Sequence, residues 1–146
     1  SGFAHGHTYI GHATACAAGL AVLDVIEDDG LLEQTRKRGA ELLREVTAAF
    51  GSHPNVGDIR GRGLFLGIEL VSDRTTRAGF ADKALAERLR RAALDHGLVC
   101  YPGSIVVNGA TVPHIMLAPP MIVERSHIDE CIEKLAATLK ASLPAH

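Results

Sequence analysis

The sequence predicts an α/β fold in which a small, mostly antiparallel sheet is covered by helices on one face. Segments with helical or strand periodicity follow one another in the order α, α, β, β, α, β, β, α. Runs of strands followed by helices favour a sheet with helical cover. The 146 residues are 47% hydrophobic and 22% charged, which is enough apolar material for one packed core.

The first helix is expected over residues 13–27, and it is unusual in having apolar side chains on every side. The stretch is rich in alanine, the strongest helix former. A helix that is apolar all round is normally buried on most sides. It fits poorly on one face of a small sheet. We therefore expect this helix to pack into a larger body than such a sheet provides.

After the first helix we expect a second helix followed by a hairpin. Residues 31–50 carry apolar side chains at helical spacing with charged residues between them. Strands are expected over residues 56–60 and 64–71, joined by a glycine-rich hairpin or bulge. Alternation in the second strand places Glu69 on a solvated face.

The third helix is expected over residues 82–96. Gly97 stands directly after it, at the position where glycine commonly ends a helix. A short strand is expected over residues 98–101. Residues 102–111 contain Asn108-Gly109 and are expected to form a loop or hairpin.

A further strand is expected over residues 112–118, because Pro119-Pro120 stops it. The last helix is expected over residues 125–143. We expect Ser126 to be its N-cap, with Asp129 as the acid of a capping box.

Composition excludes several classes of partner and setting. Fifteen basic residues against seventeen acidic ones leave a net charge of −2 with no basic stripe, which argues against nucleic acid and membrane partners. No apolar run approaches a membrane span, and the start does not resemble a signal peptide. Cys16, Cys100 and Cys131 are too few and too far apart for a disulfide framework or a metal clip. We therefore expect a reducing, cytoplasmic setting.

The stretch "HGHTYIGH", residues 5–12, holds the densest group of polar side chains. His5 and His7 would lie on one side of an extended chain and His12 could join them, but no carboxylate is close in sequence, so we assign no metal. The stretch is alternatively a polar loop that leads into the first helix. Such a loop combines free N–H groups, the Thr8 hydroxyl and the positive end of a helix, which together form a receptor for phosphate.

The residues resemble a known family at this point. "FAHGHTYIGHATACAAGLAVLDVIE" is similar to the stretch that follows the cofactor lysine in class III (omega-type) aminotransferases, which are fold type I enzymes that use pyridoxal 5′-phosphate. "VGDIRGRGLFLGIELV", "HGLVCYPG" and "HIMLAPPMIV" follow in the family's order. The resemblance implies that residues 1–30 end the large cofactor-binding domain and that residues 31–146 form the C-terminal small domain.

The resemblance also implies roles for individual residues. Thr8 would bind the cofactor phosphate across the interface of a homodimer, through its hydroxyl and backbone N–H. His7 would shape the cofactor site. Tyr9 and Tyr101 would contact the substrate, an amine or a keto acid. We assign His5 and His12 to structure.

The resemblance leaves the catalytic residue outside this chain. The family's Schiff-base lysine and the main phosphate cradle are expected upstream of Ser1, in an N-terminal portion with which this chain would associate. None of the four lysines of the chain matches the lysine motif, so we nominate no catalytic residue and expect the chain to be inactive by itself. They are Lys37, Lys83, Lys134 and Lys140.

The sequence departs from the family in two places. The family often places an arginine for the substrate carboxylate just after the strand matching residues 98–101, whereas this chain has Cys100-Tyr101-Pro102 and no arginine between Leu98 and Glu124. Neither tyrosine nor proline can form a bidentate clamp. Ala13 also replaces a common proline.

Three other functions stay open on the sequence. The chain could belong to another fold type I enzyme, such as a decarboxylase or mutase. It could be a non-catalytic α/β module that binds a partner through its apolar first helix. The third alternative is a metal-dependent hydrolase built on His5 and His7.

Overall fold

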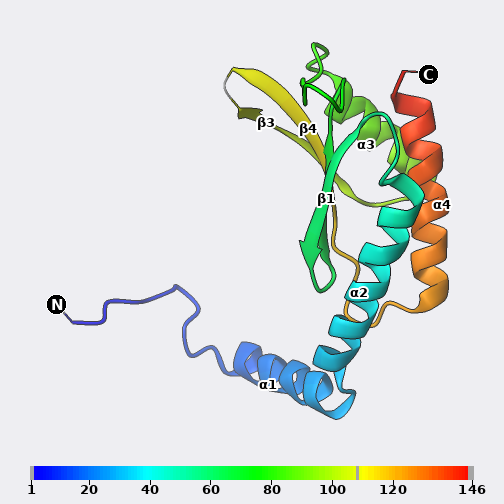
Figure 1. Ribbon diagram of the computed structural model, residues 1–146. Helices are drawn as coiled ribbons and strands as arrows, with labels where there is room; N and C mark the ends of the chain where they lie inside the picture. The colour runs from blue at the N-terminus through cyan, green and yellow to red at the C-terminus, as the bar shows by residue number, and fades with distance from the viewer. Residues whose placement is uncertain (1, 108, 145–146) are drawn as a thin grey trace.

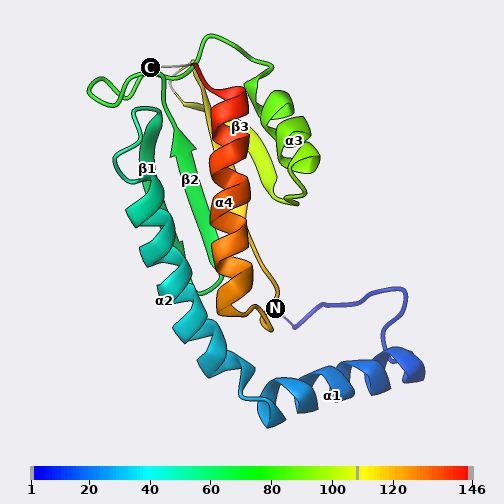
Figure 2. The same ribbon diagram turned by 90° about the vertical axis from the view of Figure 1, so that its right-hand side faces the viewer.

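The computed structural model describes residues 2–107 and 109–144, and it has the predicted order of elements (Figure 1). The helices are α1 (Ala13–Asp28), α2 (Leu31–Phe50), α3 (Leu85–Asp95) and α4 (Arg125–Ser142). The strands are β1 (Val56–Arg62), β2 (Phe65–Leu70), β3 (Tyr101–Val107) and β4 (Ala110–Leu117). The strands form one antiparallel sheet in the order β1-β2-β4-β3. Helices α2, α3 and α4 cover one face of this sheet, as predicted, and leave the other face open (Figure 2).

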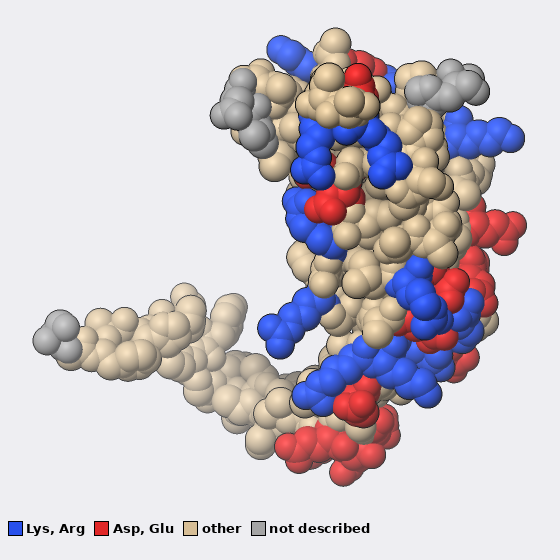
Figure 3. Space-filling model, in the orientation of Figure 1, with Lys and Arg blue, Asp and Glu red and all other residues tan. Residues whose placement is uncertain are grey.

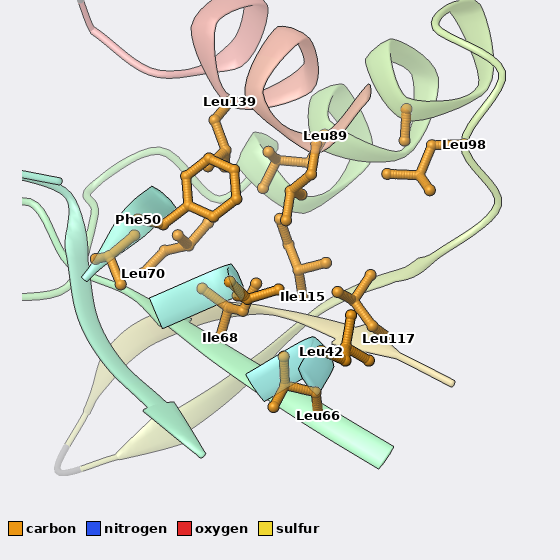
Figure 4. Packing of buried hydrophobic residues seen from close by; sticks show 14 of the residues in the cluster. Leu42, Phe50, Leu66, Ile68, Leu70, Leu89, Leu98, Ile115, Leu117 and Leu139 are labelled. Atoms are coloured by element: carbon orange, nitrogen blue, oxygen red, sulfur yellow. The ribbon is translucent and has the colours of Figure 1, made fainter. Parts of the chain in front are cut away.

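Alternating side chains of the two central strands form the floor of the core. Leu66, Ile68 and Leu70 of β2 and Ile115 and Leu117 of β4 are buried against the covering helices (Figure 4). Burial of each such side chain contributes roughly 1.5–3 kcal/mol. The covering helices supply the side chains that pack on this floor, chiefly Leu42, Val46, Phe50, Leu89, Leu135 and Leu139.

The predicted strand over residues 98–101 is wrong in position. Leu98 lies outside the sheet, and its N–H donates to the carbonyl oxygen of Ala93 at 2.7 Å. Gly97 has a φ of +73°. Together they close the end of α3 with the hydrogen bond typical of a glycine C-cap. Leu98 therefore belongs to the helix end, and β3 begins at Tyr101. Strands β3 and β4 pair antiparallel from Tyr101 to Val107, so of the two alternatives predicted for residues 102–111 the hairpin is confirmed.

The predicted cap of the last helix is also wrong. The N-cap is Glu124, one residue before α4, and Ser126 lies inside the first turn. The Glu124 side chain accepts from the backbone of His127, and His127 Nδ1 accepts from the Glu124 N–H at 3.1 Å. An imidazole therefore takes the place expected of an acid. Asp129 is instead bound by Arg125, one turn earlier in the same helix, at 2.9 Å.

Helix α1 projects away from the body of the molecule (Figures 1 and 2). None of its residues is buried. The cover that the sequence predicts for this helix is not provided by the described part of the chain. The apolar side chains it exposes are Leu20, Val22, Leu23 and Val25.

Candidate functional site

The loop before α1 is a turn over residues 8–11 held by its own backbone. The Ile10 N–H donates to the carbonyl oxygen of His7 and the His12 N–H to that of Tyr9, both at 3.1 Å. Gly11 has a φ of +75°, a conformation that glycine adopts without strain. The turn places His7, Thr8 and Tyr9 side by side at the start of a helix.

A histidine side chain caps the start of α1. The sequence assigns this residue, His12, to structure without naming its contact. His12 is the N-cap residue, and its Nδ1 accepts from the Ala15 N–H at 3.2 Å. This bond satisfies one of the N–H groups that a helix start leaves free. The assignment of His12 to structure therefore has a specific contact behind it.

The turn leaves hydrogen-bond donors free beside the positive end of α1. Within the described part of the chain, neither the Thr8 hydroxyl nor the Thr8 and Tyr9 N–H groups have a hydrogen-bond partner. A hydroxyl, free amides and the start of a helix are groups that can bind the acceptor oxygens of a phosphate. The donors present therefore fit the phosphate group of pyridoxal 5′-phosphate.

The histidine pair at the N-terminal side of the turn makes its own contact. His5 and His7 approach through their Nε2 atoms at 2.9 Å, with ring centroids 4.4 Å apart and nearly perpendicular planes. The sequence prediction that these rings share one side is confirmed. No group of three or more metal-binding side chains is found among the described residues.

Tyr101 belongs to a different element from the loop. It is the first residue of β3, opposite Met116 of β4, and 63% of its surface is exposed. In both ribbon views the N-terminal segment lies in the lower half of the molecule, apart from β3 (Figures 1 and 2). The chain by itself therefore brings His7, Thr8 and Tyr9 together and leaves Tyr101 separate.

The open face of the sheet carries a hollow that sequence reasoning missed. Its volume is about 510 Å³. Phe65, Ile105, Val112 and Met116 give it an apolar lining, and His114 lies on its floor. The signal was present in the alternation of β4, where every second residue from Val112 points away from the core.

Charged groups border this hollow. Arg60 pairs with Asp58, and its Nη1 lies 3.3 Å from Glu69 Oε2. The bonds to Asp58 and then to Glu69 raise the pKa of Arg60. Glu69, which was predicted to lie on a solvated face, thus forms an ion pair with Arg60 on the open face. Residues 2–23, in contrast, include no Lys, Arg, Asp or Glu, and this arm is drawn in tan (Figure 3).

All three cysteines are free. Burial, and then the neighbouring Cys131, raise the pKa of Cys100 to about 11. Burial likewise raises the pKa of Cys131. Both thiols therefore stay protonated near neutral pH, and neither has the character of a nucleophile.

Most of the chain matches a known family. Residues 1–139 match the model of the class-III aminotransferases. An uncharacterized aminotransferase of Schizosaccharomyces pombe is 40% identical over 139 residues, which are 94% of this chain and 30% of that protein. Diaminobutyrate–2-oxoglutarate transaminase of Halomonas elongata is 37% identical over 134 residues, 89% of this chain and 27% of its own length. The chain belongs to the class-III aminotransferase family.

Solved structures agree with the family match. An (S)-enantioselective omega-transaminase from Thermomicrobium roseum superposes with a TM-score of 0.83 at 33% identity. The match covers 99% of this chain and 30% of that one. The chain therefore spans about 30% of the length of such relatives, with the fold that this portion has in them. No described helix is both long and apolar enough to cross a membrane.

Proposed function

We propose that this chain is the C-terminal part of a pyridoxal-phosphate-dependent transaminase, which moves an amino group between an amine or omega-amino acid and a keto acid or aldehyde. The observation that carries the proposal is the class-III match over residues 1–139. Relatives named for diaminobutyrate and for putrescine both lie among the similar proteins. Their names favour transamination over the decarboxylase, mutase, hydrolase and non-catalytic alternatives.

Thr8 has the clearest proposed role. Its hydroxyl and N–H would bind the phosphate of the cofactor, supported by the free amide of Tyr9 and the start of α1. His7, next to it, would form part of the cofactor site. When bound, pyridoxal phosphate supplies an electron sink that makes amino transfer possible. The residues of this chain hold and orient it.

The substrate side of the site is proposed to involve Tyr9 and Tyr101. Both are exposed aromatic residues with a hydroxyl, so each can pack against a substrate and also bind a polar group. Since no arginine lies between Leu98 and Glu124, this stretch offers no bidentate partner for a carboxylate. A substrate carboxylate would have to be bound by other parts of the protein.

The complete protein is proposed to be a homodimer in which residues 1–30 belong to the large domain and residues 31–146 to the small domain. The apolar surface of α1 supports this division, because it has no cover in the described chain. A Schiff-base lysine would come from the remainder of the protein, and this chain by itself would not catalyse the reaction. The cytoplasm is the proposed compartment, since the cysteines are free.

The experiment is an amino-transfer assay on the complete protein that carries this chain. The wild type and Thr8→Ala are titrated with pyridoxal phosphate in the presence of an amine and a keto acid. The wild type is expected to transfer the amino group. Loss of a hydrogen bond to a charged group costs about 1.5–3 kcal/mol, so Thr8→Ala is expected to bind the cofactor about 10- to 100-fold more weakly.

Thr47→Ala is the matched control, since Thr47 is an exposed threonine on α2. Its cofactor affinity should equal that of the wild type. Absence of amino transfer at saturating cofactor, across amine donors with and without a carboxylate, would contradict the proposed function. Equal affinity of Thr8→Ala and wild type would contradict the role of Thr8 alone.

A further inference from the structure

His12 joins the turn over residues 8–11 to helix α1 by contacts on both sides. Its N–H donates to the carbonyl oxygen of Tyr9 at 3.1 Å, which closes the turn. Its carbonyl oxygen accepts from the Cys16 N–H at 3.0 Å, and its Nδ1 accepts from the Ala15 N–H at 3.2 Å. The His12 ring also meets the Tyr9 ring edge to face, with centroids 6.1 Å apart. One residue thus fixes the turn relative to the start of the helix.

Gly11, the neighbour of His12 within the turn, contributes no restraint of this kind. It has a φ of +75°, and glycine samples a wider range of backbone dihedral angles than other residues. Apart from its sequence neighbours, no atom of the described chain lies within 4 Å of the place that a Cβ would take at Gly11. The orientation of the turn on α1 therefore depends on the contacts of His12 and not on packing around Gly11.

The bond to Ala15 also defines the tautomer of His12. A backbone N–H can only donate, so Nδ1 must offer its lone pair and the ring proton must lie on Nε2. An imidazolium carries a proton on both nitrogens and would lose this bond. Neutral His12 therefore does the work of the Ser, Thr, Asp or Asn oxygen that usually caps a helix.

We propose that His12 is a positioning residue for the cofactor phosphate, because its side-chain bond to α1 holds the Thr8 hydroxyl and the Thr8 and Tyr9 N–H groups in their binding arrangement. This role rests on the function proposed above. Donors that are already ordered before binding need not be ordered during it, which favours affinity. The same bond keeps the first turn of α1 intact, so the positive end of the helix stays beside these donors.

Three substitutions at His12 separate the effect of the bond from that of the ring. His12→Asn keeps an acceptor at the same distance from the backbone, because Asn Oδ1 and His Nδ1 are both bonded to Cγ. His12→Phe keeps a ring that can meet Tyr9 but has no acceptor. His12→Ala has neither. If the bond to Ala15 positions the turn, the Asn variant should behave as the wild type and the Phe variant as the Ala variant.

The measurement compares the binding of pyridoxal 5′-phosphate with that of pyridoxal, which lacks the phosphate. Both are titrated by absorbance into the complete protein freed of cofactor, and the ratio of the two Kd values isolates the contribution of the phosphate. A turn that spends a tenth to a third of its time in the binding arrangement binds about 3- to 10-fold more weakly. The preference for the phosphorylated compound is therefore expected to fall by about 3- to 10-fold in His12→Phe and His12→Ala, and to match the wild type in His12→Asn.

Amide hydrogen exchange of the same cofactor-free proteins is the second readout. The N–H groups of Ile10, His12, Ala15 and Cys16 are hydrogen-bonded in this turn and helix start. Peptides that cover residues 8–16 are expected to exchange faster in His12→Phe and His12→Ala than in the wild type, and at the wild-type rate in His12→Asn.

His53→Ala is the control, because it removes a bond of the same kind at another place. His53 Nδ1 accepts from the Asn55 N–H at 3.1 Å, in the turn before β1. This variant should keep the wild-type ratio of Kd values. Equal ratios in the wild type, His12→Phe and His12→Ala would overturn the role of His12 and leave the proposed function intact. So would an Asn variant as impaired as the Ala variant. A wild type that binds neither compound would contradict the proposed function, and this role with it.

Discussion

Arg125 joins two helices at the edge of the core through three carboxylates. Its Nη1 lies 2.9 Å from Glu41 and 3.1 Å from Glu45 of α2, and its Nη2 lies 2.9 Å from Asp129 of α4. The hydrogen bond from Arg38, and then that from Arg125, lower the pKa of Glu41 below its ordinary value of 4.5. The bond from Arg44 is the main cause that lowers the pKa of Glu45.

A pH dependence of stability follows from these lowered values. A carboxyl whose pKa is lower in the folded state contributes stability above its unfolded pKa, and this contribution is lost as the pH falls through the folded pKa. Arg125→Gln is expected to lower the Tm at pH 7, and the difference from wild type should shrink as the pH falls below 4.5. Thermal unfolding from pH 7 to pH 3 measures this.

Arg36→Gln is the control for this pH series. Arg36 pairs with Glu33 within α2 on an exposed surface, where an ion pair contributes about 0–1 kcal/mol. Its Tm should stay near that of the wild type at every pH. A difference between Arg125→Gln and wild type that is the same at pH 7 and pH 3 would exclude the proposed linkage.

At the scale of elements, α2 and the β1–β2 hairpin make contact through two glycines. A Cβ atom built on Gly39 would lie 2.3 Å from the carbonyl carbon of Gly63, and Gly63 itself has a φ of +57°. The helix therefore touches backbone rather than side chains at this crossing. The sequence predicted a glycine-rich hairpin after α2, but it did not predict that the hairpin would contact Gly39.

Gly39→Ala is expected to destabilise the protein by about 1–3 kcal/mol, because overpacking against backbone cannot be relieved by a rotamer change. This outcome is opposite to helix propensity, which favours alanine by about 1 kcal/mol. Denaturant unfolding measures the change. Gly67→Ala in β2 is the control, since the nearest atom to its Cβ is 3.8 Å away, and its stability should match or exceed wild type. Equal effects of the two substitutions would argue against the contact.

At the scale of the molecule, the chain exposes more surface than its size requires. A compact protein of 15.5 kDa is expected to expose about 7,200 Å². This chain exposes 9481 Å². The excess, about 2,300 Å², is of the size buried in obligate interfaces. Since α1 has no buried residue, much of that excess lies on this helix and the segment before it.

The proposed cover of α1 predicts the effect of a charge on its apolar surface. In the complete protein Leu23→Glu is expected to lower the Tm by several degrees or to prevent soluble expression, because it buries an unpaired charge. Leu94→Glu in α3 is the matched control. Leu23 and Leu94 are each 57% exposed in this chain. The Leu94 variant is expected to change stability by about 0.5 kcal/mol or less. Similar Tm values for both variants would contradict a covered α1.

The sequence by itself determined the order of elements, the helical cover of one face and the family. These depend on periodicity, on glycine and proline positions and on ordered motifs, which are local properties of the chain. The alternation in β2 correctly predicted that Glu69 would lie on the face opposite the core. The sequence also predicted a polar loop leading into the first helix, which the structure has at residues 8–11.

Tertiary structure decided the rest. Leu98 closes α3 instead of starting a strand, and Glu124 caps α4 instead of Ser126. The exact ends of helices depend on hydrogen bonds made in the folded structure, so sequence patterns place them only to within one or two residues. The hollow on the open face and the free edge of β3 depend on the pairing of distant strands. Periodicity assigns side chains to faces, but only the assembled sheet decides which faces and edges stay uncovered.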